Sequence, residues 1–196
     1  MALFVIADLH LSSDGTKSME KFGSRWTDYM QRLAKNWNAV VRPDDTVIIP
    51  GDISWAMSLS EVEKDFAFLH SLPGRKLIMK GNHDYWWSTK RKMDAFLAEK
   101  GFDSVEILHN NAFRVGDFTL CGSRGWFYDA QTGNDKKVIS REAGRIEMSL
   151  KQAEMLGGEI ICFLHYPPVM GSQKCEEIME VLVRHGVKRC YFGHLQ

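Results

Sequence analysis

The 196-residue sequence lacks several features that would assign it quickly to a class. Its four cysteines include no C-x-x-C pair, and three of them lie in apolar runs, so we expect small core residues rather than metal ligands or disulfides. Neither sign of charge is in excess, because Lys plus Arg and Asp plus Glu both number 25. This balance argues against a dedicated nucleic-acid surface.

Long hydrophobic runs are also missing. No stretch is long enough to cross a membrane, and the apolar start MALFVIADLH has neither a preceding basic segment nor a signal-peptide cleavage site. We therefore expect a cytoplasmic protein without a membrane partner. The sequence shows no repeat, linker or low-complexity segment, and its length suits one hydrophobic core. We expect a single domain over residues 1–196.

Apolar runs typical of buried strands alternate with segments of helical periodicity. Expected strands cover residues 2–8, 45–52, 75–84, 159–168 and 187–196, and expected helices cover 18–41, 60–72, 88–100, 140–156 and 175–185. Between them, 104–126 predicts neighbouring antiparallel strands and 129–137 predicts a loop. Ser60 and Glu63 have the spacing of a capping box. The order predicts a layered α/β fold with a mainly parallel sheet and antiparallel additions.

Five expected strands end on side chains suited to metal binding. In chain order these are Asp8 and His10, Asp52, Asn82 with His83 and Asp84, His165, and His194. Each motif alone is weak, because Asp, Asn and Gly are common turn residues and a lone histidine is usually structural. Ligands of α/β sheets bind beyond the carboxyl ends of the strands, so the joint pattern predicts one shared site.

The mixture of ligand types indicates which ions the site would take. Two divalent cations about 3.5–4 Å apart repel each other, so an anionic ligand must bridge them. Imidazole favours transition metals, whereas a shell of oxygens alone would favour Mg or Ca. The mixture predicts two divalent transition-metal ions, with manganese as the first choice and iron or zinc as alternatives.

Together the motifs closely resemble those of the calcineurin-like metallophosphoesterase family. The family pattern is D-x-H, G-D, G-N-H-[DE], a lone H and G-H-x-H, and the resemblance extends from Asp8 to the last residue. It implies a layered α/β sandwich of mixed sheets flanked by helices. By analogy Asp52 bridges both metals, Asp8 and His10 hold one metal, and the other is held by Asn82, His165 and His194.

The resemblance also implies a reaction. A hydroxide between the metals would attack phosphorus in line with the leaving oxygen, so the chain would be a phosphomonoesterase or phosphodiesterase with a small phosphorylated substrate. His83 is expected to face that substrate as a general acid or as a charge on the phosphate. Asp84 is expected to orient His83, or else to cap the next helix.

Other residues near the motifs are candidates for the substrate pocket. Arg124 in GSRGW is expected to bind phosphate, with an ordinary surface position as the alternative. Aromatic residues also follow the motif loops and form either pocket walls or core; they are Trp86, Trp87, Trp126 and Tyr128.

Departures from other branches of the family narrow the choice. The segment GDISWAM lacks the G-D-x-x-D-R-G pattern of protein serine/threonine phosphatases, and His83 stands where lipid A pathway hydrolases carry arginine. The chain lacks the long extra domains of double-strand-break nucleases. It most resembles a small bacterial or archaeal phosphohydrolase group. A cyclic-nucleotide phosphodiesterase and a catalytically silent scaffold of the same fold stay open as alternatives.

The last motif departs from the family pattern. Gln196 stands where the second histidine of G-H-x-H would complete the Asp8/His10 metal site. An amide oxygen is a poorer ligand than imidazole for a transition metal, so we expect this site to be weaker or more open than its partner. The other interpretation is a shortened version of a longer chain, lacking C-terminal strands.

Overall fold

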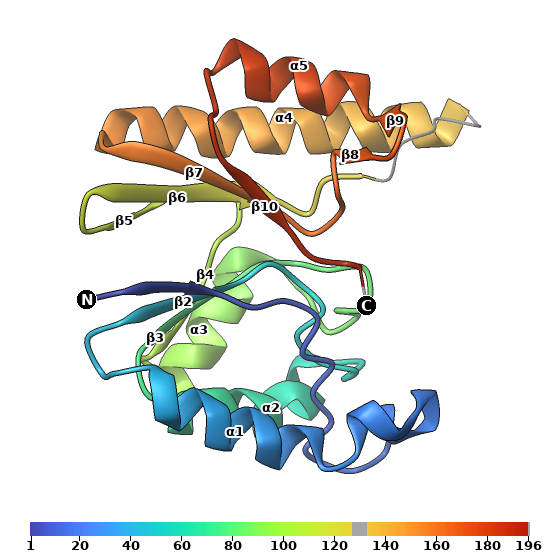
Figure 1. Ribbon diagram of the computed structural model, residues 1–196, viewed down its shortest axis with the longest axis vertical. Helices are drawn as coiled ribbons and strands as arrows, with labels where there is room; N and C mark the ends of the chain where they lie inside the picture. Colours follow the sequence, from blue (N-terminus) through green and yellow to red (C-terminus); the bar gives the residue numbers. More distant parts are fainter. Residues whose placement is uncertain (127–132, 196) are drawn as a thin grey trace.

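Two four-stranded sheets lie face to face, and helices cover the outer face of each (Figure 1). The computed structural model describes residues 1–126 and 133–195. Side chains from both sheets, among them Ile48, Leu77, Ile161 and Phe163, form the core between them. Their neighbours along each strand point the other way and pack under the helices. This arrangement confirms the predicted class, a layered α/β sandwich of mixed sheets flanked by helices.

The first sheet is parallel throughout, in the order β1-β2-β3-β4. Its strands span Leu3–Val5, Thr46–Ile49, Arg75–Ile78 and Val105–Ile107. Its helices are α1 (Tyr29–Val40), α2 (Leu59–Ser71) and α3 (Lys90–Lys100). All four residues of β2 are buried, as expected for a strand that is covered on both faces.

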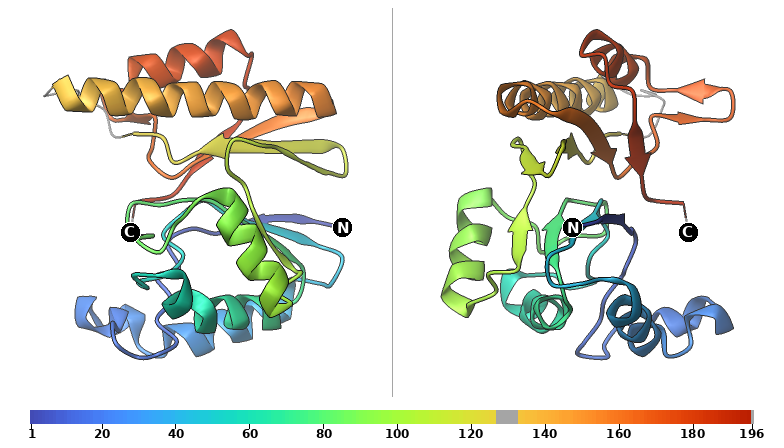
Figure 2. Two further views of the ribbon diagram at one scale, coloured as in Figure 1. Left: turned by 180° about the vertical axis from the view of Figure 1, so that it is seen from behind. Right: turned by 60° about the vertical axis from the view of Figure 1, so that its left-hand side comes forward.

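The second sheet has the order β10-β7-β6-β5, in which β5 runs antiparallel to β6 and the other neighbours are parallel. Strands β5, β6, β7 and β10 span, in that order, Phe113–Val115, Phe118–Ser123, Glu159–Leu164 and Cys190–Phe192. Helices α4 (Gly133–Leu156) and α5 (Glu176–Arg184) cover its outer face, as the turned views in Figure 2 show. A short hairpin, β8 (Val169–Met170) and β9 (Gln173–Lys174), precedes α5.

The helix predicted over residues 18–41 is interrupted. Two short 3-10 helices, η1 (Met19–Phe22) and η2 (Ser24–Trp26), precede α1, which begins only at Tyr29. Gly23 has φ 126° and Asp28 has φ 51°, and neither value fits a right-handed helix. The apolar periodicity before Tyr29 therefore does not produce a continuous helix.

Three more local predictions are corrected. Strand β4 pairs in parallel with β3 in the first sheet, although an antiparallel neighbour was expected, and the antiparallel pair consists of β5 and β6. Helix α4 begins at Gly133, inside the predicted loop 129–137, of which 129–132 lie outside the described residues. The N-cap of α2 is Ser58, whose hydroxyl accepts a hydrogen bond from Glu61 N at 3.3 Å. The capping serine thus lies two residues before the predicted Ser60.

Of the three cysteines predicted to be core residues, Cys121 and Cys162 are buried, and Cys190 is half-buried against the same hydrophobic cluster. All four cysteines are free, and Cys175 is buried as well. Among the helices of the described ranges, none combines the length and the apolar character that a membrane span needs.

The strand ends of both sheets meet at one edge of the sandwich. The parallel strands run toward the side on which the C-terminus lies, between the two layers (Figure 1). Loops that follow β1, β2, β3, β7 and β10 therefore converge there, and these loops carry the predicted ligands.

Candidate metal centre

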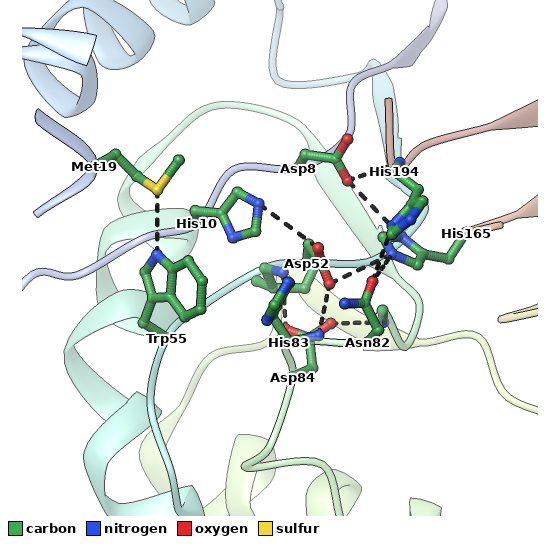
Figure 3. A network of polar contacts seen from close by, with 12 residues as sticks. Asp8, His10, Met19, Asp52, Trp55, Asn82, His83, Asp84, His165 and His194 are labelled. Carbon is green, nitrogen blue, oxygen red and sulfur yellow. Dashed lines mark hydrogen bonds and ion pairs between the residues drawn. The ribbon is translucent and has the colours of Figure 1, made fainter. Parts of the chain in front are cut away.

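The predicted ligands come together at the converging loops (Figure 3). Asp8 and His10 follow β1, Asp52 follows β2, and Asn82 follows β3. His165 follows β7 and His194 follows β10, so both sheets contribute. The ligand atoms of Asp52, His165 and His194 all lie within 4.8 Å of one another.

Four of these residues adopt backbone conformations that L-residues rarely accept. Their φ angles are 58° at Asp8, 45° at His10, 51° at Asp52 and 71° at His194. Each such conformation costs about 1–3 kcal/mol and persists only where the surroundings enforce it. Backbone bonds between the first two loops do so, with His10 N donating to Asp52 O at 2.9 Å. These strained positions all lie in the loops that carry the ligands.

Two glycines let the loops approach closely. A Cβ added to Gly81 would lie 2.1 Å from Asp52 Oδ1 and 2.2 Å from Asp52 N. A Cβ added to Gly51 would lie 2.6 Å from His165 Nδ1. The glycine of each G-D or G-N motif therefore provides the space in which Asp52 and His165 lie side by side.

Asp52 is the centre of the arrangement. Its side chain is fully buried, and its two oxygens face different histidines. His10 Nε2 lies 3.6 Å from Oδ2, and His165 Nε2 lies 3.5 Å from Oδ1. Oδ1 accepts a hydrogen bond from His83 N at 2.9 Å, but Oδ2 is buried and accepts none from the described residues. A buried carboxylate oxygen without a donor is costly unless a cation binds it, so the residues fit a metal here.

Around Asn82, His165 and His194, hydrogen-bond acceptors also face one another. Asn82 Oδ1 lies 2.6 Å from His165 Nε2 and 3.0 Å from His194 Nδ1. His165 Nδ1 lies 3.0 Å from Pro50 O, so the carbonyl fixes its proton there and leaves the Nε2 lone pair facing Asn82 and Asp52. Lone pairs that converge in this way are the donor set of a metal site.

The protonation states also suit metal binding. Burial lowers the pKa of both His10 and His165 to about 4, so both imidazoles are neutral near pH 7 and each offers a lone pair. Burial lowers the pKa of His194 as well. Burial, and to a lesser degree the charge of Asp52, raises the pKa of Asp8 to about 6, although a hydrogen bond from His194 N at 3.1 Å opposes the rise.

Asp84 stabilises the loops and does not contact the His83 ring. Its carboxylate accepts hydrogen bonds from the backbone of Ile53, Ser54 and Gly81 and from the Trp86 indole, at 2.7–3.2 Å. Burial raises its pKa to about 7. The expected contact with His83 is wrong, and so is the expected helix cap, because Thr89 caps α3. Asp84 ties the loop after β3 to the loop after β2.

Aromatic rings hold His83 instead. Its ring centroid lies 4.7 Å from that of Trp55, 5.6 Å from that of His10 and 6.1 Å from that of Tyr85. Sequence reasoning missed Trp55, which also stacks on His10 at 4.9 Å and donates its indole N–H to Met19 Sδ at 3.4 Å (Figure 3). Its position three residues after Asp52, within GDISW, was the available signal.

Comparison with known proteins agrees with this geometry. A family model described as calcineurin-like phosphoesterase matches residues 1–196. The chain belongs to the calcineurin-like phosphoesterase family. Membership supports a metal-dependent phosphoester hydrolase in general terms, with divalent ions as cofactor.

Individual relatives of this calcineurin-like phosphoesterase are distant. It is 33% identical over 78 residues to the Gene 66 protein of Mycobacterium phage L5, a match covering 40% of this chain and 37% of the phage protein. Its fold is similar to TT1561 of Thermus thermophilus, with TM-score 0.60 and 14% identity over 97% of this chain and 80% of that one. It is also similar to the phosphopantetheinyl hydrolase PptH of Mycobacterium tuberculosis, with TM-score 0.54 and 14% identity over 99% and 82%. At 14% identity, the similarity to these two solved structures shows the fold alone.

The remaining predicted pocket residues of the phosphoesterase are divided between the site and its surroundings. Arg124 O accepts hydrogen bonds from His165 N and Tyr166 N, but its guanidinium points to Glu142 of α4, 3.5 Å from Oε1. Trp86 is core, with 2% exposure, and Trp87 packs against the same core. Trp126 is half-buried beside the Tyr166 ring. Tyr128 and Gln196 lie outside the described residues.

Proposed function

We propose that this calcineurin-like phosphoesterase hydrolyses small phosphomonoesters or phosphodiesters with a pair of divalent transition-metal ions. Manganese is the first choice of metal. The observation that carries the proposal is the buried Asp52 carboxylate, which has one imidazole beside each oxygen and, among the described residues, no hydrogen bond to Oδ2. A carboxylate in this position is suited to bridge two cations. Family membership supports the broader class of reaction.

By analogy with the family motifs, the ligands would be divided between two ions that share Asp52. On one side Asp8 and His10 would hold the first ion, and on the other side the second ion would be held by Asn82, His165 and His194. When bound, the ions would supply an activated water and positive charge beside the phosphoryl oxygens. The Pro50 carbonyl keeps His165 in the tautomer that can ligate.

His83 is the residue that we propose to contact substrate. Trp55 and Tyr85 hold its ring beside the ligands, and its backbone N–H is committed to Asp52. An imidazole held there can donate a proton to the leaving oxygen or place a charge beside the phosphate. A proton donor of this kind typically contributes about 10²–10⁴-fold to the rate.

Activity measurements with a matched control test the proposal. Manganese-loaded protein is expected to hydrolyse aryl phosphomonoesters or diesters, and Asp52→Asn is expected to abolish this. Asp117→Asn is the control, because Asp117 is exposed in the turn between β5 and β6. A panel that includes cyclic nucleotides would show whether diesters are preferred. Absence of hydrolysis together with absence of manganese binding would support a silent scaffold instead.

A further inference from the structure

Three cationic side chains gather beside the candidate metal centre, and we call them the basic cluster: Lys80, Arg124 and Arg145. Lys80 follows β3 two residues before Asn82, and Arg124 follows β6. Arg145 lies near the middle of α4, one turn after Glu142. The cluster thus combines both sheets and a helix.

The charges of the basic cluster are not balanced. Glu142 of α4 is buried and pairs with both arginines, with Arg124 Nη2 at 3.5 Å and Arg145 Nη1 closer. Among the described residues, the two arginines therefore share one carboxylate, and Lys80 has no ion pair of its own. Lys80 is close enough to Arg124 and Arg145, and to the carboxylates of Glu142 and Asp84, to interact with them electrostatically.

The basic cluster also has unused hydrogen-bonding capacity. Arg124 Nε is buried and has no hydrogen-bond partner among the described residues. The guanidinium lies over the Trp126 ring at 5.3 Å, which fixes its plane. Two guanidinium groups and an ammonium that are only partly neutralised form a strong site for a phosphate group.

A series of ring contacts joins the metal ligands to the basic cluster. The Tyr166 ring lies 4.6 Å from the His194 ring and 5.2 Å from the His165 ring, and on its other side 5.8 Å from Trp126. Trp126 in turn contacts Arg124. A small ligand bound at the metals would therefore extend along Tyr166 toward the cations.

We infer that the basic cluster binds a second phosphate of the substrate, so the substrates are small molecules that carry two phosphate groups. The inference rests on the proposed function, because the first phosphate would be the one hydrolysed. The net positive charge of the cluster matches a phosphate dianion. It also gives Arg145 and Lys80 a role that the sequence motifs did not indicate.

Paired substrates test the inference. Adenosine 3′,5′-bisphosphate and fructose 1,6-bisphosphate are compared with adenosine 5′-monophosphate and fructose 6-phosphate, with manganese present. At least one bisphosphate is expected to exceed its partner in kcat/KM by about tenfold or more, an effect that Lys80→Gln and Arg145→Gln should each remove. Lys92→Gln is the control, because Lys92 is exposed on α3. Equal kcat/KM values for both bisphosphates and their partners, or an advantage that persists in either variant, would overturn the inference.

Equilibrium binding separates this inference from the proposed function. If neither these four esters nor the aryl phosphomonoesters and diesters are hydrolysed, the proposed function fails, and calorimetric binding of adenosine 3′,5′-bisphosphate decides the inference. Tighter binding to the unsubstituted protein than to Lys80→Gln, by about tenfold, supports the basic cluster as a phosphate site. Equal affinities overturn it. Lys80→Gln is suited to this comparison because it breaks no ion pair in the part of the chain that the structure describes.

Discussion

His10 and Trp55 show which parts of the site could be read from the sequence. His10 belongs to a strand-end motif, so its role as a ligand could be predicted and the structure brings it to Asp52. Trp55 belongs to no ligand motif, and its stacking on His10 depends on how the loop after β2 folds back. Asp84 was assigned the wrong partner for the same reason, because its hydrogen bonds go to backbone groups that no motif specifies.

His83→Gln tests the role of the His83 imidazole, which lies between the rings of Trp55 and Tyr85. We expect kcat to fall by about 10²–10⁴-fold, because glutamine cannot transfer the proton or carry the charge. Metal content should stay unchanged, because His83 is not among the proposed ligands. Steady-state kinetics and metal analysis provide the two readouts, with His70→Gln as the control on the outer helix α2. Full activity in His83→Gln, or loss of metal, would contradict this role.

Gln196→His tests the incomplete last motif. We expect calorimetric titration of the unsubstituted protein with manganese to show one tight and one weak site. The substitution should strengthen the weak site by at least about tenfold, the lower end of what changes around a metal ligand produce. Asn110→His, a change outside the motifs, serves as the comparison. Two equally tight sites before substitution would show that residue 196 does not limit the Asp8/His10 site.

Loops rather than strands determine the geometry of the centre, and Gly81→Ala tests this. The added methyl group would overlap Asp52 Oδ1 and N, so the loop after β3 must move away from the loop after β2. We expect loss of high-affinity manganese binding and a destabilisation of about 1–3 kcal/mol in denaturant unfolding. Gly144→Ala is the matched control, because a Cβ there meets nothing within 4 Å in α4. It should stabilise the protein by about 0.5–1 kcal/mol. Normal metal binding by Gly81→Ala would show that the close approach is dispensable.

Where α5 packs on α4, a histidine at the end of α5 lies between two carboxylates of α4. His185 Nδ1 lies 2.6 Å from Glu154 Oε1 and its Nε2 lies 3.2 Å from Glu147 Oε1, so these carboxylates, Glu154 first, raise the pKa of His185. Because the folded protein binds the His185 proton more tightly than the unfolded chain does, this proton stabilises the fold at a pH below the unfolded-state pKa of about 6.5. The stabilisation is lost as the pH rises through the pKa of the folded state. We expect the free energy of unfolding to fall as the pH rises above 6.5, by less than about 1 kcal/mol because the pair is near the surface.

Denaturant unfolding between pH 5.5 and 8.5 measures this effect. His185→Gln and Glu154→Gln should each reduce the decline. An unchanged pH profile in both variants would assign the decline to other groups.

Element boundaries were predictable where local signals agreed with the tertiary structure. The strands after which the ligands lie were predicted, because long apolar runs ending in polar residues are strong signals. The helix over 18–41 was predicted too long, because the positive φ values of Gly23 and Asp28 come from the packing of the loop and not from the apolar period. Helix α4 was predicted too short, because its first residues are polar.

Both sheets contribute ligands to the candidate metal centre, so neither sheet alone could form it. Asp52 and Asn82 come from the first sheet, and His165 and His194 come from the second. The sequence predicted that strand ends would share a site but not which strands form which sheet. Strand pairing is long-range, and β4 and β5 are adjacent in sequence yet lie in different sheets.

The most direct test concerns the bridging role of Asp52. Electron paramagnetic resonance of the protein at saturating manganese, combined with metal analysis, reports both the number of ions and whether they are coupled. We expect two ions per chain with the spectrum of an exchange-coupled pair, retained in Asp117→Asn and lost in Asp52→Asn. A single ion per chain at saturation, or two uncoupled ions, would contradict a centre built around Asp52.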